Sequence, residues 1–369
     1  MTENGPRREN KLLDAAVAWL RDRLPQSWEV GLTTRADLLA PDAGVDGAID
    51  VRGNSGVVNT ILVQTKQSFS PRDVDRLLGG LTKAYQRMHN NIPILLVAPW
   101  LSQGTQDRLR VGGVNYLDLT GNVWISLDNP TLLISTQGAR RDPSPPAATK
   151  LTVRGPKAGR LIRWLIDVRP PYGVRDLASA TRISPSYVSR LLDTLDEEAL
   201  VERNRRGTIA SVDVTRLLRR WTETYSVLRA NDATTFIVPL GAPDTLDRVR
   251  DLSERIAVTG SFAAVRRAPV AAPALLAVYT DQPAELATAL DLLPADAGTN
   301  VLLLRPYDAV VWERTCADDG ITYVADSQAA ADCLTGTGRM PAEGQALLEW
   351  MTANEATWRL PELPKVAPA

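Results

Sequence analysis

Four residues in the first fifth of the sequence have the types and spacing for metal-assisted chemistry on a phosphate. Asp50 ends one predicted strand, and Gln64 and Lys66 close the next. Residues two apart on a strand share a face, so the side chains of Gln64 and Lys66 point the same way. A carboxylate can hold a divalent cation such as Mg²⁺, while a neighbouring strand supplies a second ligand and a lysine that offsets charge on the phosphate. We expect Asp50 to converge on Gln64 and Lys66, with Asp46 as the alternative acid.

These residues resemble the core of the restriction-endonuclease-like PD-(D/E)xK fold, in the Mrr-like variant where glutamine replaces the acid. The resemblance implies a Mg²⁺-dependent DNA endonuclease with Asp50, Gln64 and Lys66 as catalytic residues and Asp50 as the metal ligand. No other cofactor is expected. Because a fold does not establish chemistry, a domain that has lost cleavage and serves to bind DNA or to dimerise is the alternative.

The middle of the chain has the spacing of a helix-turn-helix. Apolar residues recur at helical intervals in three predicted helices, residues 159–168, 174–181 and 185–200. Residues 182–184 form a three-residue turn, in which Ser184 is a natural N-cap, and Pro185 fits the first helical position. Residues 201–212 predict a two-stranded hairpin. This order is typical of a winged helix-turn-helix, whose third helix enters the major groove of DNA.

Polar and basic side chains of this segment are candidates for contact with double-stranded DNA. Those expected to face bases lie around the start of the third helix: Ser184, Ser186, Tyr187, Ser189 and Arg190. Arg190 could pair bidentately with a guanine. Hairpin arginines expected on the phosphate backbone or in the minor groove are Arg203, Arg205 and Arg206. Further phosphate candidates lie before or in the first helix: Lys150, Arg154, Lys157, Arg160 and Arg163.

The charge distribution agrees with this assignment. The net charge of the chain is −1, but residues 150–220 carry 15 basic and 8 acidic side chains, a net of +7. Residues 1–149 are nearly neutral at +1, and residues 221–369 reach −9. Only the middle segment suits a polyanion. The acidic segment is expected to contact protein, or the basic middle of its own chain.

The wider sequence resembles the antitoxin-like regulators of abortive-infection type IV toxin–antitoxin systems. Three segments carry the resemblance: residues 116–122 (YLDLTGN), the helix-turn-helix pattern over residues 170–201, and residues 336–351 (GTGRMPAEGQALLEWM). The resemblance implies a winged helix that binds an operator. It also implies a C-terminal domain that supports dimerisation or contacts a cognate protein.

The predicted fold class is multidomain α/β, because strand-like and helical patterns alternate on both sides of the basic segment. Four divisions are expected: a restriction-endonuclease-like domain over residues 1–137, a Pro-rich linker over 138–149, the winged helix over 150–220, and a C-terminal α/β domain over 221–369. Three helices in this scheme are residues 71–88, a bridging helix over 221–231, and residues 245–256.

Composition narrows the class of protein. No apolar run approaches the ~18 residues of a membrane span, and the N-terminus lacks the apolar core of a signal peptide, so a cytoplasmic protein without membrane contact is expected. Cys316 and Cys333 form no CxxC pair, and His89 is the only histidine, which disfavours zinc. Three functions follow, in this order: a DNA-binding transcriptional regulator acting as a homodimer, a DNA endonuclease, and a protein-binding antitoxin-like module.

Overall fold

The computed structural model describes residues 5–33, 45–54, 56–79, 92–128, 131–140, 142–143, 152–204, 206–250, 252 and 255–364. His89, Lys150 and Arg205 lie outside these ranges, as do residues 80–88 of the predicted helix. The chain forms two compact units, Met1–Thr149 with Glu197–Ala199, and Lys150–Asp196 with Leu200–Ala369. The predicted winged helix and C-terminal domain therefore belong to one compact unit.

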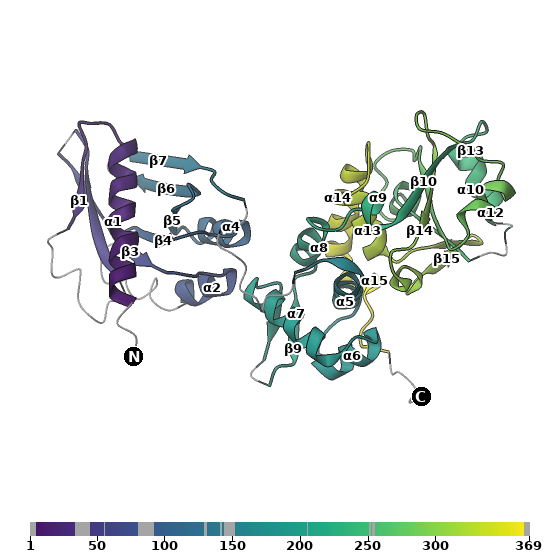
Figure 1. The fold of residues 1–369 in the computed structure, drawn as a ribbon, viewed down its shortest axis with the longest axis horizontal. Coiled ribbons are helices and arrows are strands. Elements are labelled where there is room, and N and C mark those ends of the chain that lie inside the picture. The colour runs from purple at the N-terminus through teal and green to yellow at the C-terminus, as the bar shows by residue number, and fades with distance from the viewer. Residues whose placement is uncertain are drawn as a thin grey trace. The chain divides into compact units, whose positions relative to one another are not determined.

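The first unit is built on a mixed sheet whose strands follow the chain order (Figure 1). The strands are β1 Glu29–Leu32, β2 Gly47–Arg52, β3 Val58–Thr65, β4 Ile94–Ala98, β5 Asn115–Asp118, β6 Val123–Asp128 and β7 Thr131–Thr136. Strands β1 to β3 are antiparallel, β3 to β5 are parallel, and β5 to β7 are antiparallel again. The parallel strands are joined by helices, as parallel pairs require.

Helices cover both faces of this sheet. They are α1 Gly5–Arg23, α2 Pro71–Gly79 and α4 Gln103–Val111. Leu13, Val17 and Leu20 of α1 share one core with alternate strand residues such as Ile61 and Val63. On the other face, side chains of α2 and α4 pack with the intervening strand residues. The period-two alternation of the strands thus divides their apolar residues between two layers.

The second unit begins with four helices and a two-stranded hairpin. These are α5 Gly155–Asp167, α6 Val174–Thr181, α7 Pro185–Glu197, β8 Val201–Arg203, β9 Ile209–Val212 and α8 Val214–Thr222. The register joins Val201 to Val212, and the backbone amide of Ile209 donates to the carbonyl of Tyr172 at 3.0 Å. The hairpin is therefore also tied to the segment that precedes α6.

A second mixed sheet follows, with strand order β13-β10-β14-β12-β11-β16-β15. Its strands are β10 Asp232–Ile237, β11 Ile256–Thr259, β12 Leu276–Thr280, β13 Leu293–Pro294, β14 Val301–Arg305, β15 Cys316–Asp318 and β16 Ile321–Tyr323. The accompanying helices are α9 Val227–Ala230, α10 Ala242–Arg250, α11 Ser261–Ala264, α12 Pro283–Ala289, η3 Ala309–Trp312, α13 Asp326–Leu334, α14 Met340–Ala353 and α15 Glu355–Trp358. Within the described residues the chain is thus an α/β protein with two mixed sheets of seven strands each, and the predicted α/β class is confirmed.

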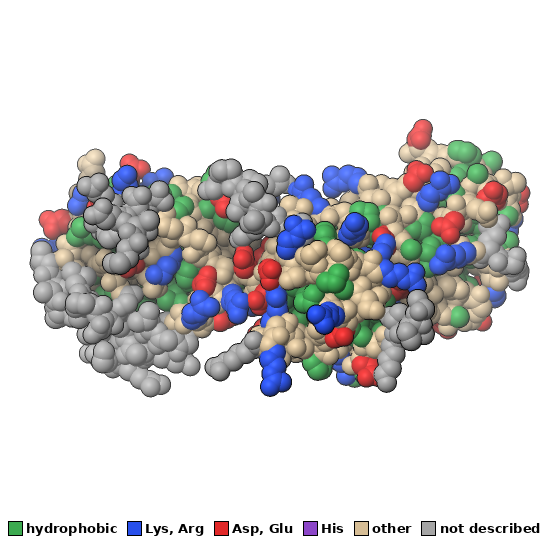
Figure 2. All heavy atoms as spheres, turned by 60° about the horizontal axis from the view of Figure 1, so that its bottom comes forward, with side chains coloured by type: hydrophobic (Ala, Val, Ile, Leu, Met, Phe, Trp, Pro, Cys, Tyr) green, Lys and Arg blue, Asp and Glu red, His purple; other side chains and the backbone are tan. Residues whose placement is uncertain are grey.

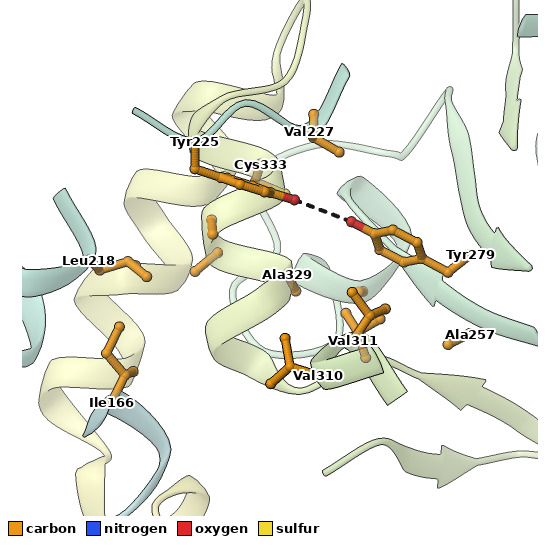
Figure 3. Close-up of a cluster of buried hydrophobic side chains, with 14 of the residues drawn as sticks. Ile166, Leu218, Tyr225, Val227, Ala257, Tyr279, Val310, Val311, Ala329 and Cys333 are labelled. Carbon is orange, nitrogen blue, oxygen red and sulfur yellow. Dashed lines mark hydrogen bonds between the residues drawn. The ribbon is translucent and has the colours of Figure 1, made fainter. Parts of the chain in front are cut away.

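One continuous core joins the helices of the second unit to its sheet. Ile166 of α5 and Leu218 of α8 lie in the same apolar cluster as Ala257 and Val311 (Figure 3). Nothing in the apolar spacing of the sequence separates core residues that face a sheet from those that face another helix. The boundary expected near residue 220 therefore crosses a shared interior.

Two predicted helices were wrong in extent. The bridging helix expected over residues 221–231 is replaced by the end of α8 and the short α9. Helix α8 begins earlier than expected, after its N-cap Asp213, and ends at Thr222 with Glu223 as its C-cap. The helix over residues 245–256 stops at Arg250, and Ile256 opens the buried strand β11. Over the described ranges, no helix has both the length and the apolar character needed to cross a bilayer.

Candidate nucleic-acid interface

The turn between α6 and α7 is set by a residue in the left-handed conformation. Arg182 has φ 55° and ψ 37°, and its amide donates to the carbonyls of Ala178 and Ser179. This conformation ends α6 by satisfying its last carbonyls, a role more often taken by glycine. Ser184 then precedes α7, and its carbonyl accepts from the amides of Tyr187 and Val188. The three-residue turn therefore has the geometry that the sequence predicts.

Helix α7 buries one face and exposes the start of the other. Its apolar residues at helical spacing are buried in the core cluster that also holds residues of α5 and α6: Val188, Leu191, Leu192 and Leu195. Ser184, Ser186 and Arg190 are exposed, and Ser189 is half-buried. Arg190 forms no ion pair with a described residue, so its guanidinium is available to a ligand.

Tyr187 is the aromatic residue of this face. Its ring is half-buried against the core, and burial raises the pKa of its hydroxyl while the charge of Arg190 opposes the shift. The phenol is therefore neutral at pH 7 and can donate a hydrogen bond.

One of the arginines predicted to contact DNA, Arg203, instead fixes the hairpin to α7. Arg203 donates to Asp193 of α7 at 2.6 Å, and its side chain is only 15% exposed. At the tip, the side chain of Asn204 accepts from the amides of Arg206 and Thr208. Arg206 is exposed. The geometry gives Arg203 a positioning role and leaves Arg206 at the surface.

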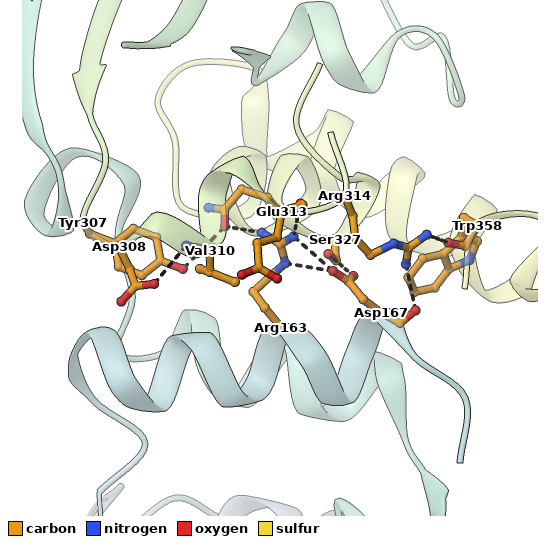
Figure 4. Close-up of polar contacts among 10 residues, drawn as sticks. Arg163, Asp167, Tyr307, Asp308, Val310, Glu313, Arg314, Ser327 and Trp358 are labelled. Carbon is orange, nitrogen blue, oxygen red and sulfur yellow. Dashed lines mark hydrogen bonds and ion pairs between the residues drawn. The ribbon is translucent and has the colours of Figure 1, made fainter. Parts of the chain in front are cut away.

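Arg163 corrects the expectation that the basic residues of α5 face phosphate. It is fully buried, and its guanidinium donates to Asp167 Oδ2 at 3.0 and 3.3 Å and to Gln328 Oε1 at 2.7 Å (Figure 4). Every residue from Leu161 to Asp167 is buried, so α5 is covered on all sides and position 163 lies inside, where a cation survives only if it is paired.

Arg160 is also turned toward the C-terminal part of the chain. It makes a bidentate contact with Asp308, at 2.9 and 2.7 Å, and the Asp308 side chain is 4% exposed. The structure thus engages Arg160 within the second unit. It bears out the expectation that the acidic segment contacts the basic middle of its own chain.

Other basic residues remain at the surface of this segment. They are exposed and form no ion pair with a described residue: Arg154, Lys157, Arg175, Arg182, Arg190 and Arg206. Arg175 and Arg182 lie on α6 and in the turn after it, and apolar spacing alone does not single them out. Lys and Arg side chains stand out from the surface in the lower central part of Figure 2, with carboxylates between them.

The first unit does not bring Asp50 to Gln64 and Lys66. Asp50 lies opposite Thr60 in the β2–β3 pair and accepts from the Thr60 hydroxyl at 2.6 Å. The same register places Gln64 four residues farther along β3, which is roughly 13 Å at ~3.3 Å per residue. The spacing of the motif in the sequence does not reveal this register, because the turn length decides which residues face each other.

The alternative acid, Asp46, lies at the correct end of the strand pair. The Asp46 amide donates to the Val63 carbonyl, and its carboxylate accepts from the Thr65 amide at 2.6 Å. Gln64 is buried, and Lys66, two residues farther along the chain, is half-buried. Among the described residues no group of three His, Cys, Asp or Glu side chains could hold a metal ion. Asp46 and Gln64 alone make a poor Mg²⁺ site, since only one of them carries a charge.

The YLDLTGN segment forms the end of β5 and a turn built around a buried carboxylate. Asp118 is fully buried, and its carboxylate accepts from the amides of Leu101, Thr120 and Asn122 and from the side chains of Thr120 and Asn122. The side chain of Asn122 in turn bonds to Gly138 and Ala139. This motif anchors the exit of the first sheet and offers no group for catalysis.

The GTGRMPAEGQALLEWM segment likewise serves packing. It begins in the α13–α14 turn and supplies most of α14. A Cβ at Gly344 would lie 2.7 Å from the Leu334 amide nitrogen, so glycine permits the close approach of the two helices.

Comparison with protein-family models, curated proteins and solved structures finds no match to the chain.

Proposed function

We propose that residues 152–212 form a winged helix-turn-helix and that the protein is a transcriptional regulator that binds a specific double-stranded DNA sequence. The observation that carries this proposal is the three-residue turn between α6 and α7, together with the unpaired, exposed Arg190 one turn into α7. In this arrangement the start of the third helix enters the major groove. Arg190 would read a base, and Arg206 on the hairpin would contact the backbone.

The remaining residues take supporting roles in this proposal. Tyr187 donates from a ring that the core holds in place, and Ser186 and Ser189 supply short polar contacts to the groove. Lys157 lies at the start of α5 and would meet a phosphate. A homodimer would present two α7 helices to a symmetric operator whose half-sites are about one helical turn apart.

Genome-wide mapping of bound DNA tests this function and supplies a fragment for the variants. We expect Arg190→Ala to weaken binding to that fragment and to relax specificity at one base pair, at a cost of about 1–3 kcal/mol. Arg206→Ala should weaken specific and nonspecific DNA alike and lower the salt slope by about 1. Arg229→Ala is the matched control, because Arg229 is exposed on α9, outside the proposed interface. The proposal fails if no fragment is enriched, or if Arg190→Ala and the control bind equally.

A second candidate is a metal-dependent DNA endonuclease in the first unit. It is favoured by the element order, in which α1 and three antiparallel strands precede α2 and a fourth strand parallel to β3, as in the core that the sequence resembles. Here Asp46, and not Asp50, would act with Lys66. Incubation of a bound fragment with Mg²⁺ or Mn²⁺ tests this. Cleavage lost in Lys66→Ala and Asp46→Asn but kept in Asp50→Asn supports the candidate, and absence of cleavage by the unaltered protein refutes it.

A further inference from the structure

A cavity in the second unit is lined by charged side chains that the proposed DNA contacts do not use. Its volume is about 190 Å³. That is room for about six water molecules at ~30 Å³ each. The lining comes from the end of α5, the β15 region, the start of α13 and α15: Asp167, Arg267, Arg314, Cys316, Ala325, Asp326, Thr357 and Trp358.

Arg267 is held in one orientation with donors to spare. Its guanidinium lies over the Trp350 ring, 5.1 Å from the centroid, and its Nε is 3.4 Å from Asp326 Oδ1. Its two Nη atoms have no hydrogen-bond partner among the residues described. The Trp350 ring contacts the face of the guanidinium and Asp326 contacts only its Nε, so the two Nη atoms are free to donate hydrogen bonds to a carboxylate.

Arg314 adds a positive charge that no described carboxylate neutralises. Its Nη atoms donate to the carbonyls of Asp167, at 2.7 Å, and Trp358, at 2.6 Å (Figure 4). Its backbone is held at φ 60°, which non-glycine residues rarely adopt. The Asp167 carboxylate is already engaged by Arg163 and Ser327. Arg267 and Arg314 therefore face one remaining carboxylate, that of Asp326, and the cavity has a net charge of about +1.

We propose that this cavity binds a small organic monocarboxylate and that the ligand regulates DNA binding. The carboxylate contacts the Nη atoms of Arg267, and the apolar body of the ligand lies against Ala325 and Trp358. A dianion such as phosphate is disfavoured, because Asp326 within the same cavity repels a second negative charge.

The link to DNA runs through Arg314 and rests on the proposed function. One of its Nη atoms holds the carbonyl at the end of α5, the first helix of the winged helix-turn-helix. A carboxylate bound by Arg267 also attracts the Arg314 guanidinium in the same cavity. It thereby weakens one of the ties between the end of α5 and the segment around Trp358, the other being the bond from the Leu360 amide to the Asp167 carbonyl. Ligand binding should therefore lower the affinity of the protein for its operator, and by reciprocity DNA should lower the affinity for the ligand.

Calorimetric titration of the full-length protein tests the site without DNA. The probes are benzoate, its neutral counterpart benzamide, and inorganic phosphate. We expect benzoate to bind at least tenfold more tightly than benzamide or phosphate. Arg267→Gln should weaken benzoate binding about tenfold, since a charge-assisted pair is lost, and Arg267→Lys should weaken it less. Arg248→Gln is the matched control, because Arg248 also pairs with an aspartate, Asp291, and does not line the cavity.

Each outcome decides one part of the proposal. Equal binding of benzoate and benzamide, tight binding of phosphate, or an unchanged affinity in Arg267→Gln overturns the monocarboxylate site. If the site stands but saturating benzoate leaves operator affinity within twofold, the regulatory role is overturned. If no DNA is bound at all, the proposed function fails, while the calorimetric result still decides the site.

Discussion

Replacing Arg163 with alanine should destabilise the second unit more than any change at its surface. The substitution removes the cation that pairs with the carboxylate of Asp167, a residue that is 3% exposed, and also removes the closer of the two donors to Gln328 Oε1. Leaving one partner of a buried ion pair without the other costs about 3–5 kcal/mol. Domains are stable by about 5–15 kcal/mol, so the loss is expected to be at least about a fifth of the total stability.

Native-state hydrogen exchange measures this loss within the second unit of the full-length protein. Amides of α5 and α13 that exchange through global opening should exchange faster by roughly a factor of 100 to several thousand, at ~1.4 kcal/mol per tenfold. The double variant Arg163→Met/Asp167→Leu removes both charges, and apolar replacements of buried pairs are often tolerated, so it should recover part of the loss. Arg169→Ala is the control on a half-buried site after α5. An increase below tenfold in Arg163→Ala, or a double variant as unstable as the single one, would refute the reasoning.

Two further changes test other buried carboxylates. Asp118→Ala leaves three amides and two side chains without their acceptor, so we expect a loss of roughly 3–5 kcal/mol in urea unfolding; Asp128→Ala, at an exposed position of β6, should cost under about 0.5 kcal/mol, and equal losses would contradict the role given to Asp118. Burial raises the pKa of Asp332, against hydrogen bonds from Thr259, Tyr225, Gln328 and Tyr279 that lower it. The folded protein then binds this proton more tightly than the unfolded chain, so stability falls as pH rises from the ordinary pKa through the raised one. The unaltered protein should therefore gain stability relative to Asp332→Asn as pH is lowered toward 4, and a difference that does not change with pH would exclude the raised pKa.

Local patterns predicted α6, α7 and the turn between them better than they predicted the surrounding elements. The turn at residues 182–184 depends on apolar spacing and on Ser184 and Pro185, which are neighbours in the chain, so composition and order suffice. Strand β11 depends instead on pairing with β12 and β16, whose residues lie far along the sequence. The four residues Ile256–Thr259 give no periodic signal of their own, and a helical reading could run on to Ile256.

The candidate site residues also differ in how far the sequence alone could predict their partners. Gln64 and Lys66 could be recognised as a pair because the strand repeat alone relates them. The partner acid could not, since Asp46 and Asp50 have equal claims until the β2–β3 register is known. Arg163 differs again: its residue type gives no signal of burial, and although Asp167 is a neighbour on the same helix, the second partner Gln328 lies far along the sequence.

The net charge of +7 in the basic segment includes two groups of cations: those that pair with carboxylates of the protein and those that are exposed. Arg160 and Arg163 neutralise Asp308 and Asp167 inside the second unit, and Arg203 holds the hairpin on Asp193. These three cations fix the shape of the proposed interface but release no counterions when DNA binds. Only the exposed cations, such as Lys157, can release counterions. Each phosphate that they contact should add about 0.9 to the slope with which the logarithm of the DNA-binding constant falls against the logarithm of the salt concentration. The Arg160–Asp308 pair and the hydrogen bond from Arg163 to Gln328 also make the acidic C-terminal part a support for the proposed helix-turn-helix, because removing it would leave Arg160 without its carboxylate and Arg163 without its second acceptor.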